Sequence, residues 1–186
     1  MQTRELIKLI DTALVDIWKN DIKDDWENCR LLKEDTLKNA MYFHLRTKLG
    51  AVFEYNNIRI FTEFSNCEFQ GMGKKVDMVI ARVDFNAPDT YLGNCIKETL
   101  AVIEIKFKAG FASHKVIEQD FQKLREYAED IGIEAKLYMA TIWEYEDDEV
   151  PWLTETEPWA QGRLTELNAS YKNDGSGDIQ FYTYRH

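Results

Sequence analysis

The fold is decided by the segment Leu100-Ala-Val-Ile-Glu104-Ile-Lys106-Phe107, the clearest strand signal in the chain. Side chains alternate between the two faces of a strand, so Glu104 and Lys106 share one face and Ile105 lies on the other. An apolar run of this kind belongs in the middle of a sheet, where two charges are costly unless they are paired or bind an ion. A strand at the sheet edge, with one solvated face, would explain the same pattern. This segment alone does not decide between the two.

Helices and strands are predicted on both sides of this segment. Apolar residues at helical spacing predict helices at 4–19, 34–49 and 115–131 and a short helix at 159–167. Runs of β-branched and aromatic residues predict strands at 58–64, 76–83, 135–143 and 178–184. We expect Gly50 to end the second helix and Gly71-Met72-Gly73 to form a turn. The charged residues 20–33 are ambiguous.

This order of elements predicts an α/β protein with a mixed sheet flanked by helices. The helix at 115–131 is long enough for a crossover connection, so the strands on either side of it are expected to be parallel. We interpret residues 1–186 as a single domain, with a helical extension at 1–33, a catalytic core at 34–142 and an acidic segment with a final strand at 143–186.

Composition and cysteine usage indicate a globular cytoplasmic protein. Hydrophobic residues make up 45% of the 186 residues, enough for one substantial core. No apolar run approaches the eighteen or more residues of a membrane span, so no membrane partner is expected. Cys29, Cys67 and Cys95 form no paired motif with each other or with histidine, which fits a reducing compartment.

The net charge of −10 is unfavourable for a protein that binds a polyanion, so its distribution matters. Residues 137–162 contain seven acids and no lysine or arginine, which leaves only −3 for the rest of the chain. The acidity is therefore a local feature of the last third. Such a segment would repel a phosphate backbone or bind a basic partner, and a protein partner or a homo-oligomer would then assist the function.

Asp77 supplies a second buried charge, because it lies in the apolar strand Val76-Asp77-Met78-Val79-Ile80. Carboxylates on neighbouring strands can converge on one hard divalent cation. Mg²⁺ retains several waters, one of which can become the nucleophile for phosphodiester hydrolysis. A lysine two residues from Glu104 is close enough to orient that water, lower its pKa or offset charge in the transition state. Asp77, Glu104 and Lys106 therefore have a common chemical explanation.

Glu34 lies on the core-facing stripe of its predicted helix, in line with Leu37, Met41 and Leu45. A glutamate in a first helical turn also complements the helix dipole, which is the structural alternative. Asp35 can fill that role from the exposed side. We therefore interpret Glu34 as a further carboxylate of the metal or water site.

This arrangement resembles the PD-(D/E)XK nuclease superfamily, which has the restriction-endonuclease-like fold. The resemblance covers residues 34–140, from the helix glutamate through the strand that ends at Glu63 to the Asp77 strand and Glu104-Ile105-Lys106. Valine rather than proline precedes Asp77. The Gln-x-x-x-Tyr signature of one branch is absent, because Lys123 stands four residues before Tyr127. No branch is assigned.

The resemblance implies a three-layer α/β/α sandwich and a Mg²⁺ or Mn²⁺ cofactor. It implies that Asp77 and Glu104 bind the metal, with the backbone carbonyl of Ile105 as a further ligand. Lys106 would be the catalytic base or an electrostatic stabiliser, and Glu34 a supporting acid.

Two further acids are weaker candidates. Asp120 falls on the apolar stripe of the helix at 115–131, where an ion pair with Lys123 on the helix surface is the alternative explanation. Glu63 is a candidate supporting acid or a solvent-facing residue at a strand end.

The predicted function is hydrolysis of phosphodiester bonds in nucleic acid by a metal-dependent nuclease, with DNA favoured over RNA. The alternative is a catalytically inactive protein of the same fold that serves as a binding subunit or a DNA-mimicking inhibitor. The acidic segment supports this alternative, whereas Asp77, Glu104 and Lys106 on apolar strands argue against it.

Overall fold

The computed structural model describes residues 1–65, 75–86, 92–109, 114–130, 134–147, 151–155 and 157–186. The helices are α1 (Thr3–Asp16), α2 (Lys23–Glu27), α3 (Glu34–Tyr55) and α4 (Lys115–Asp130), with a π-helical segment (Ile17–Ile22) between α1 and α2 and a 3-10 turn (Leu92–Cys95). The strands are β1 (Ile58–Phe64), β2 (Val76–Val83), β3 (Ile96–Ala109), β4 (Lys136–Asp147), β5 (Leu164–Lys172) and β6 (Ile179–Arg185).

The strands form one mixed open sheet whose spatial order, β1-β2-β3-β4-β5-β6, is the order of the sequence. The pairs β1–β2, β2–β3 and β5–β6 are antiparallel, whereas β3–β4 and β4–β5 are parallel. The predicted parallel pairing across the helix at 115–131 is confirmed, because α4 connects β3 to β4. The chain is an α/β protein, as its sequence predicts.

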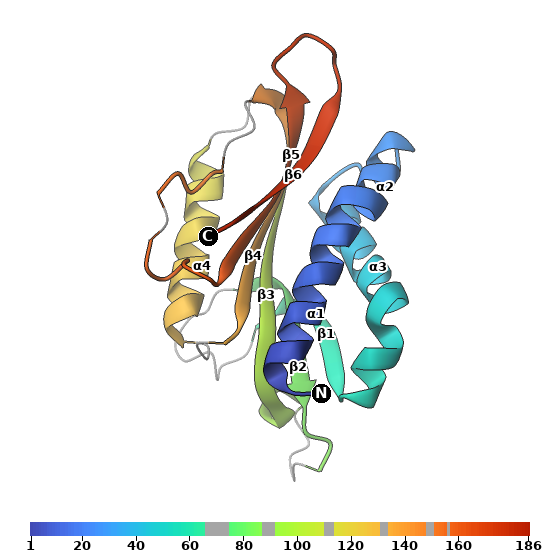
Figure 1. The fold of residues 1–186 in the computed structure, drawn as a ribbon, viewed down its shortest axis with the longest axis vertical. Coiled ribbons are helices and arrows are strands. Elements are labelled where there is room, and N and C mark those ends of the chain that lie inside the picture. Colours follow the sequence, from blue (N-terminus) through green and yellow to red (C-terminus); the bar gives the residue numbers. More distant parts are fainter. Residues whose placement is uncertain (66–74, 87–91, 110–113, 131–133, 148–150, 156) are drawn as a thin grey trace.

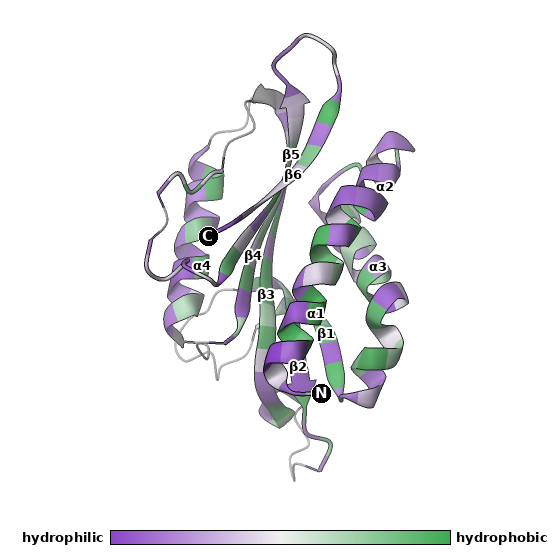
Figure 2. Cartoon of the chain, viewed as in Figure 1, coloured by the Kyte–Doolittle hydropathy of each residue, from purple (hydrophilic) through white to green (hydrophobic). Residues whose placement is uncertain are grey.

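Helices cover both faces of this sheet (Figure 1). Helices α1, α2 and α3 lie on one side, where Ile103 and Ile105 of β3 join their apolar cluster. Helix α4 lies on the other side, where Val102 joins a second cluster. Figure 2 shows hydrophobic residues where α1 meets the sheet and hydrophilic residues on the outer turns of the helices. Glu104 and Lys106 lie on the face opposite to these isoleucines, as the predicted alternation of side chains requires. On that face they contact Asp120 and Lys123 of α4.

The first helix extends further than its sequence predicts. The ambiguous residues 20–33 remain helical as far as Glu27, and Ile22 is completely buried. The indole N–H of Trp18 donates to the carbonyl of Asn168 at 3.0 Å, which ties this helical segment to β5. No helix among the described residues is long and apolar enough to cross a membrane. Cys67 and the expected Gly71–Gly73 turn lie outside the described residues.

Two predictions of element boundaries are wrong. Helix α3 does not end at Gly50 but continues to Tyr55, because Phe53 packs in the core one turn beyond the glycine. Residues 159–167 do not form a helix, since residues 158–163 are turns and β5 begins at Leu164. The first seven residues of β5 are all buried. Four of these seven residues are polar, namely Thr165, Glu166, Asn168 and Ser170, so the segment shows neither the alternation nor the apolar run by which strands are predicted.

Strand β4 also extends beyond its predicted end. It continues to Asp147 and so includes the first acids of the predicted acidic segment. Asp148 and Glu149 of that segment lie outside the described residues.

Replacing Gly50 by alanine tests the continuous α3. An alanine Cβ at this position meets no atom within 4 Å. In the middle of a helix, Gly50→Ala should therefore raise the free energy of unfolding by about 1 kcal/mol. Urea denaturation followed by circular dichroism measures the change. Gly162→Ala is the matched control, because Gly162 has a φ of +70° and alanine should destabilise the protein there. A destabilised Gly50→Ala variant would contradict the continuous helix.

Candidate active site

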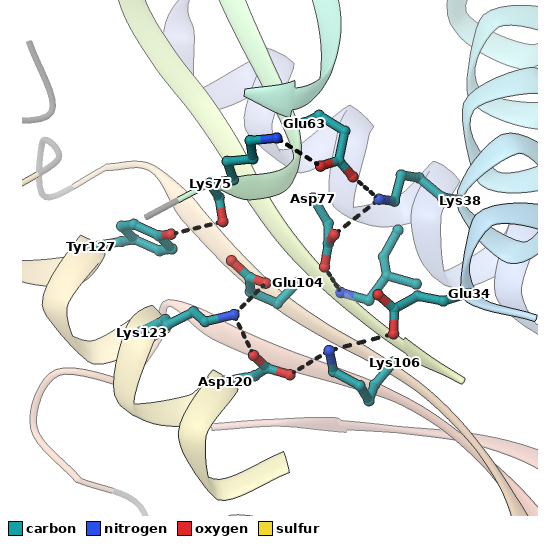
Figure 3. A network of polar contacts seen from close by, with 11 residues as sticks. Glu34, Lys38, Glu63, Lys75, Asp77, Glu104, Lys106, Asp120, Lys123 and Tyr127 are labelled. Atoms are coloured by element: carbon teal, nitrogen blue, oxygen red, sulfur yellow. Dashed lines mark hydrogen bonds and ion pairs between the residues drawn. The ribbon is translucent and has the colours of Figure 1, made fainter. Parts of the chain in front are cut away.

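The structure brings the predicted site residues together at one end of the sheet, where β2 begins and β3 ends (Figure 3). Asp77 is the second residue of β2, and its neighbour strand β3 supplies Glu104 and Lys106. The first turn of α3 supplies Glu34, whose carboxylate lies 3.4 Å from the Lys106 ammonium. Helix α4 supplies Asp120 from the opposite side of the sheet.

Asp77 occupies the point where the β2–β3 ladder ends. The last Cα pair of the ladder at this end joins Met78 to Ile103. Beyond it, Oδ2 of Asp77 accepts the backbone N–H of Ile105 at 2.9 Å. The carboxylate therefore replaces a strand–strand hydrogen bond and is held against the β3 backbone. The hydrogen bond fixes its position beside Glu104.

Lys38 lies on the other side of Asp77. Its ammonium is 3.0 Å from Oδ1 of Asp77 and also contacts Glu63, although the lysine side chain is only 8% exposed. Burial opposes the charged form, but Glu63 and Asp77 more than offset it and raise the pKa of Lys38 above its ordinary value. Glu63 has a φ of +51°, a conformation that costs backbone energy in a glutamate. Its side chain is 53% exposed, so it lies at the mouth of the cluster.

Glu104 is the least compensated acid of the cluster. It is 1% exposed, its Oε2 lies 3.8 Å from the Lys123 ammonium, and its Oε1 accepts no hydrogen bond from a described N–H or O–H group. Its carboxyl group can form a hydrogen bond with Asp77 only while it is protonated. Burial, reinforced by the neighbouring Asp77 charge, raises the pKa of Glu104 to about 9, and Lys123 offsets only part of this effect. Glu104 therefore holds a proton at neutral pH when no ion is bound.

Lys106 is held as an ammonium ion between two acids. Its Nζ lies 3.0 Å from Oδ2 of Asp120 and 3.4 Å from Glu34. Burial favours the neutral amine, but the contact with Asp120 and the charge of Glu34 outweigh it, so the pKa of Lys106 is raised. Glu34 thus has an ion-pair partner inside the site, whatever its effect on the helix dipole.

Asp120 forms more contacts than the single ion pair on the helix surface that the alternative interpretation expects. Its Oδ1 does lie 2.6 Å from the Lys123 ammonium, as the alternative interpretation expects. However, the residue is 2% exposed and reaches Lys106 as well. Asp120 therefore connects α4 to β3.

Lys38 and Tyr127 belong to the cluster but were not predicted as site residues. Lys38 lies four residues after Glu34 on the same helix face, so helical spacing was a usable signal. The Tyr127 hydroxyl donates to the carbonyl of Lys75 at 3.4 Å, and burial, followed by the charge of Glu104, raises its pKa. No spacing rule places this tyrosine near β2, because the contact depends on how α4 packs.

The donor set suits a hydrated hard cation rather than an all-protein cage. No group of three or more His, Cys, Asp or Glu side chains within the described part of the chain is arranged to hold a metal ion. Mg²⁺ commonly uses only one or two carboxylates and keeps several waters. Asp77 and Glu104 provide two neighbouring carboxyl groups, and a cation between them would replace the proton that Glu104 otherwise retains beside Asp77.

Replacing Glu104 by glutamine tests its buried carboxyl group. In the folded protein the pKa is about 9, whereas the ordinary value is 4.5. Between these values the unfolded chain releases the proton that the folded chain retains, so wild-type stability should fall as pH rises. Glu104→Gln should remove this slope, so its stability relative to wild type should increase by up to about 1.4 kcal/mol for each pH unit above the ordinary pKa.

Urea unfolding at several pH values in metal-free buffer measures the effect. Glu155→Gln, at an exposed position, is the control and should keep the wild-type slope. An unchanged slope in Glu104→Gln would show that this carboxyl group ionises normally.

The assignment of the site depends on this geometry, since comparison with known proteins adds no relative. No family model, curated protein or solved structure matches the chain.

Proposed function

We propose that the chain is a metal-dependent nuclease that hydrolyses phosphodiester bonds in nucleic acid, DNA before RNA. The observation that carries this proposal is the buried Glu104 carboxyl group, which has an unpartnered oxygen and lies beside Asp77. Such an acid reduces stability, and perturbed acids of this kind cluster at functional sites. A bound divalent cation would compensate the negative charge of both carboxylates.

The order of the elements around the site supports the same proposal. Helix α3 precedes three antiparallel strands, and α4 then leads to the parallel strand β4. Helices lie on both faces of the sheet. We propose that this layering is the α/β/α sandwich of the restriction-endonuclease-like fold, with Asp77, Glu104 and Lys106 at the positions of its motif.

Asp77 and Glu104 would hold Mg²⁺ or Mn²⁺, and the resemblance adds the carbonyl of Ile105. When bound, the cation supplies Lewis-acid stabilisation of the phosphate and lowers the pKa of water. Asp120 and Glu34 hold Lys106 as an ammonium ion, which favours the role of electrostatic stabiliser of the phosphate over the role of base. Asp120 and Glu34 orient its ammonium group.

The lysine contacts also favour a second candidate, a catalytically inactive binding subunit or DNA-mimicking inhibitor. Lys38 already neutralises Asp77, at the place where a cation would bind. In this second candidate the ion pairs are permanent and the cluster only stabilises the fold. A DNA-mimicking inhibitor needs acids that are free to bind a basic partner. Glu157 of the acidic segment instead forms an ion pair with Arg125 at 3.3 Å, which weakens the support for an inhibitor.

Cleavage and metal binding test the proposed roles directly. Wild type should cleave plasmid, linear or single-stranded DNA with Mn²⁺, and Asp77→Ala or Glu104→Ala should lose both metal binding and cleavage. Lys106→Ala should still bind Mn²⁺ by calorimetry, while cleavage falls by about two or more orders of magnitude. Lys172→Ala, which removes a lysine paired with Asp178 in the β5–β6 hairpin, is the control. Undiminished cleavage by Lys106→Ala would refute the role of Lys106.

Replacing Lys38 by methionine separates the two candidate functions. The change leaves Asp77 without its ammonium partner and should cost on the order of 3 kcal/mol in metal-free buffer. If Asp77 is a metal ligand, Mn²⁺ should restore stability and raise the melting temperature of Lys38→Met more than that of wild type. Thermal melts with and without Mn²⁺ measure this, with Lys48→Met at an exposed ion pair as control. If Mn²⁺ stabilises neither protein, Asp77 is not a metal ligand and the proposed nuclease is refuted.

A further inference from the structure

A cavity lies at the other end of the sheet, where α1, β4 and β5 begin. Its volume is about 370 Å³, and we call it the Lys136 pocket; its walls are formed by Arg4, Ile7, Lys8, Asp11, Glu134, Lys136, Gly162 and Arg163. Lys136 begins β4, and the β4 residue level with Lys106 is Thr141. Five residues of strand separate them by roughly 17 Å. The pocket is therefore distinct from the candidate active site.

The two acids of the pocket are already paired. Glu134 accepts from Arg4 at 2.9 Å. Asp11 accepts from Arg185 at 3.0 Å and from the Tyr138 hydroxyl at 3.1 Å. Lys8 and Lys136, which form no ion pair with a described residue, therefore give the pocket a positive charge, although the whole chain carries −10.

Lys136 is a partly buried cation of this wall. Its ammonium donates to the carbonyl of Gly162 at 2.7 Å, and no carboxylate of the described residues lies within ion-pair distance. Burial lowers the pKa of Lys136, and the charge of Asp11 does not restore it. An ammonium group has three donors, so two remain for a ligand.

We propose that the Lys136 pocket binds a phosphate monoester, with the phosphate against Lys136 and Lys8 and the organic part against Ile7. The charge selects an anion, and lysine is a common phosphate ligand. The volume falls in the range of small-molecule sites, about 300–1,000 Å³, so it accommodates an organic group in addition to the phosphate. The aliphatic stems of the lysines and arginines extend the apolar surface beside Ile7. Such a ligand can be a free nucleotide or the phosphorylated end of a nucleic acid.

Calorimetry on the full chain tests this proposal with adenosine 5′-monophosphate and with adenosine. The monophosphate should bind at least tenfold more tightly than the nucleoside. Lys136→Met keeps the aliphatic stem but removes the charge and should weaken binding at least tenfold. Lys8→Gln should weaken it as well, and it serves as the second variant if Lys136→Met does not fold. Lys172→Met, at the hairpin ion pair with Asp178, should bind as wild type does.

Two oligonucleotides distinguish the source of the phosphate. Tighter binding of a 5′-phosphorylated oligonucleotide than of its 5′-hydroxyl form, lost in Lys136→Met, identifies nucleic-acid ends as ligands. Binding of the monophosphate alone identifies a free nucleotide, and either result supports the pocket. Equal affinity for nucleoside and monophosphate, absence of binding, or wild-type affinity in both lysine variants overturns the proposal. None of these outcomes depends on nuclease activity.

Discussion

Buried acids at the end of the sheet require cations from both layers of helices. Lys38 extends from α3 to Asp77, and Lys123 extends from α4 to Glu104. A buried charge that loses its partner costs several kcal/mol, so neither helix can move away from the strand ends without a large penalty. The positions of the helices and the geometry of the site are thus determined by the same contacts. Glu104 is the acid that these lysines compensate least, and the proposed chemistry depends on it.

The sequence predicts strands well where the buried residues are apolar. The bounds of β1 and β2 agree with the prediction, and the central part of β3 was recognised from its apolar run. Strand β5 is not predicted, because four of its first seven residues are buried but polar and so interrupt the apolar pattern. The end of α3 was misplaced because tertiary packing of Phe53 outweighs the weak preference of Gly50 to terminate a helix.

Strand and helix periodicity predict which face of an element each site residue lies on, but not which residues of separate elements are in contact. Alternation places Glu104 and Lys106 on one face, and helical spacing places Glu34 near the core. The pairing of Lys38 with Asp77 links residues on separate elements, so no local pattern reports it. The protonation of Glu104 likewise depends on burial and on the distance to Asp77, which only the folded arrangement supplies.

The sequential order of the strands has a consequence for folding during synthesis. Each strand pairs with the one made just before it, so the sheet can grow at one edge as the chain leaves the ribosome. The clustered acids and lysines all lie between Glu34 and Tyr127, and they can therefore come together before β5 and β6 exist. The bond from the Trp18 indole to Asn168 spans 150 positions and needs a nearly complete chain. Docking of the first helical segment onto β5, and not assembly of the acid cluster, is thus the late event.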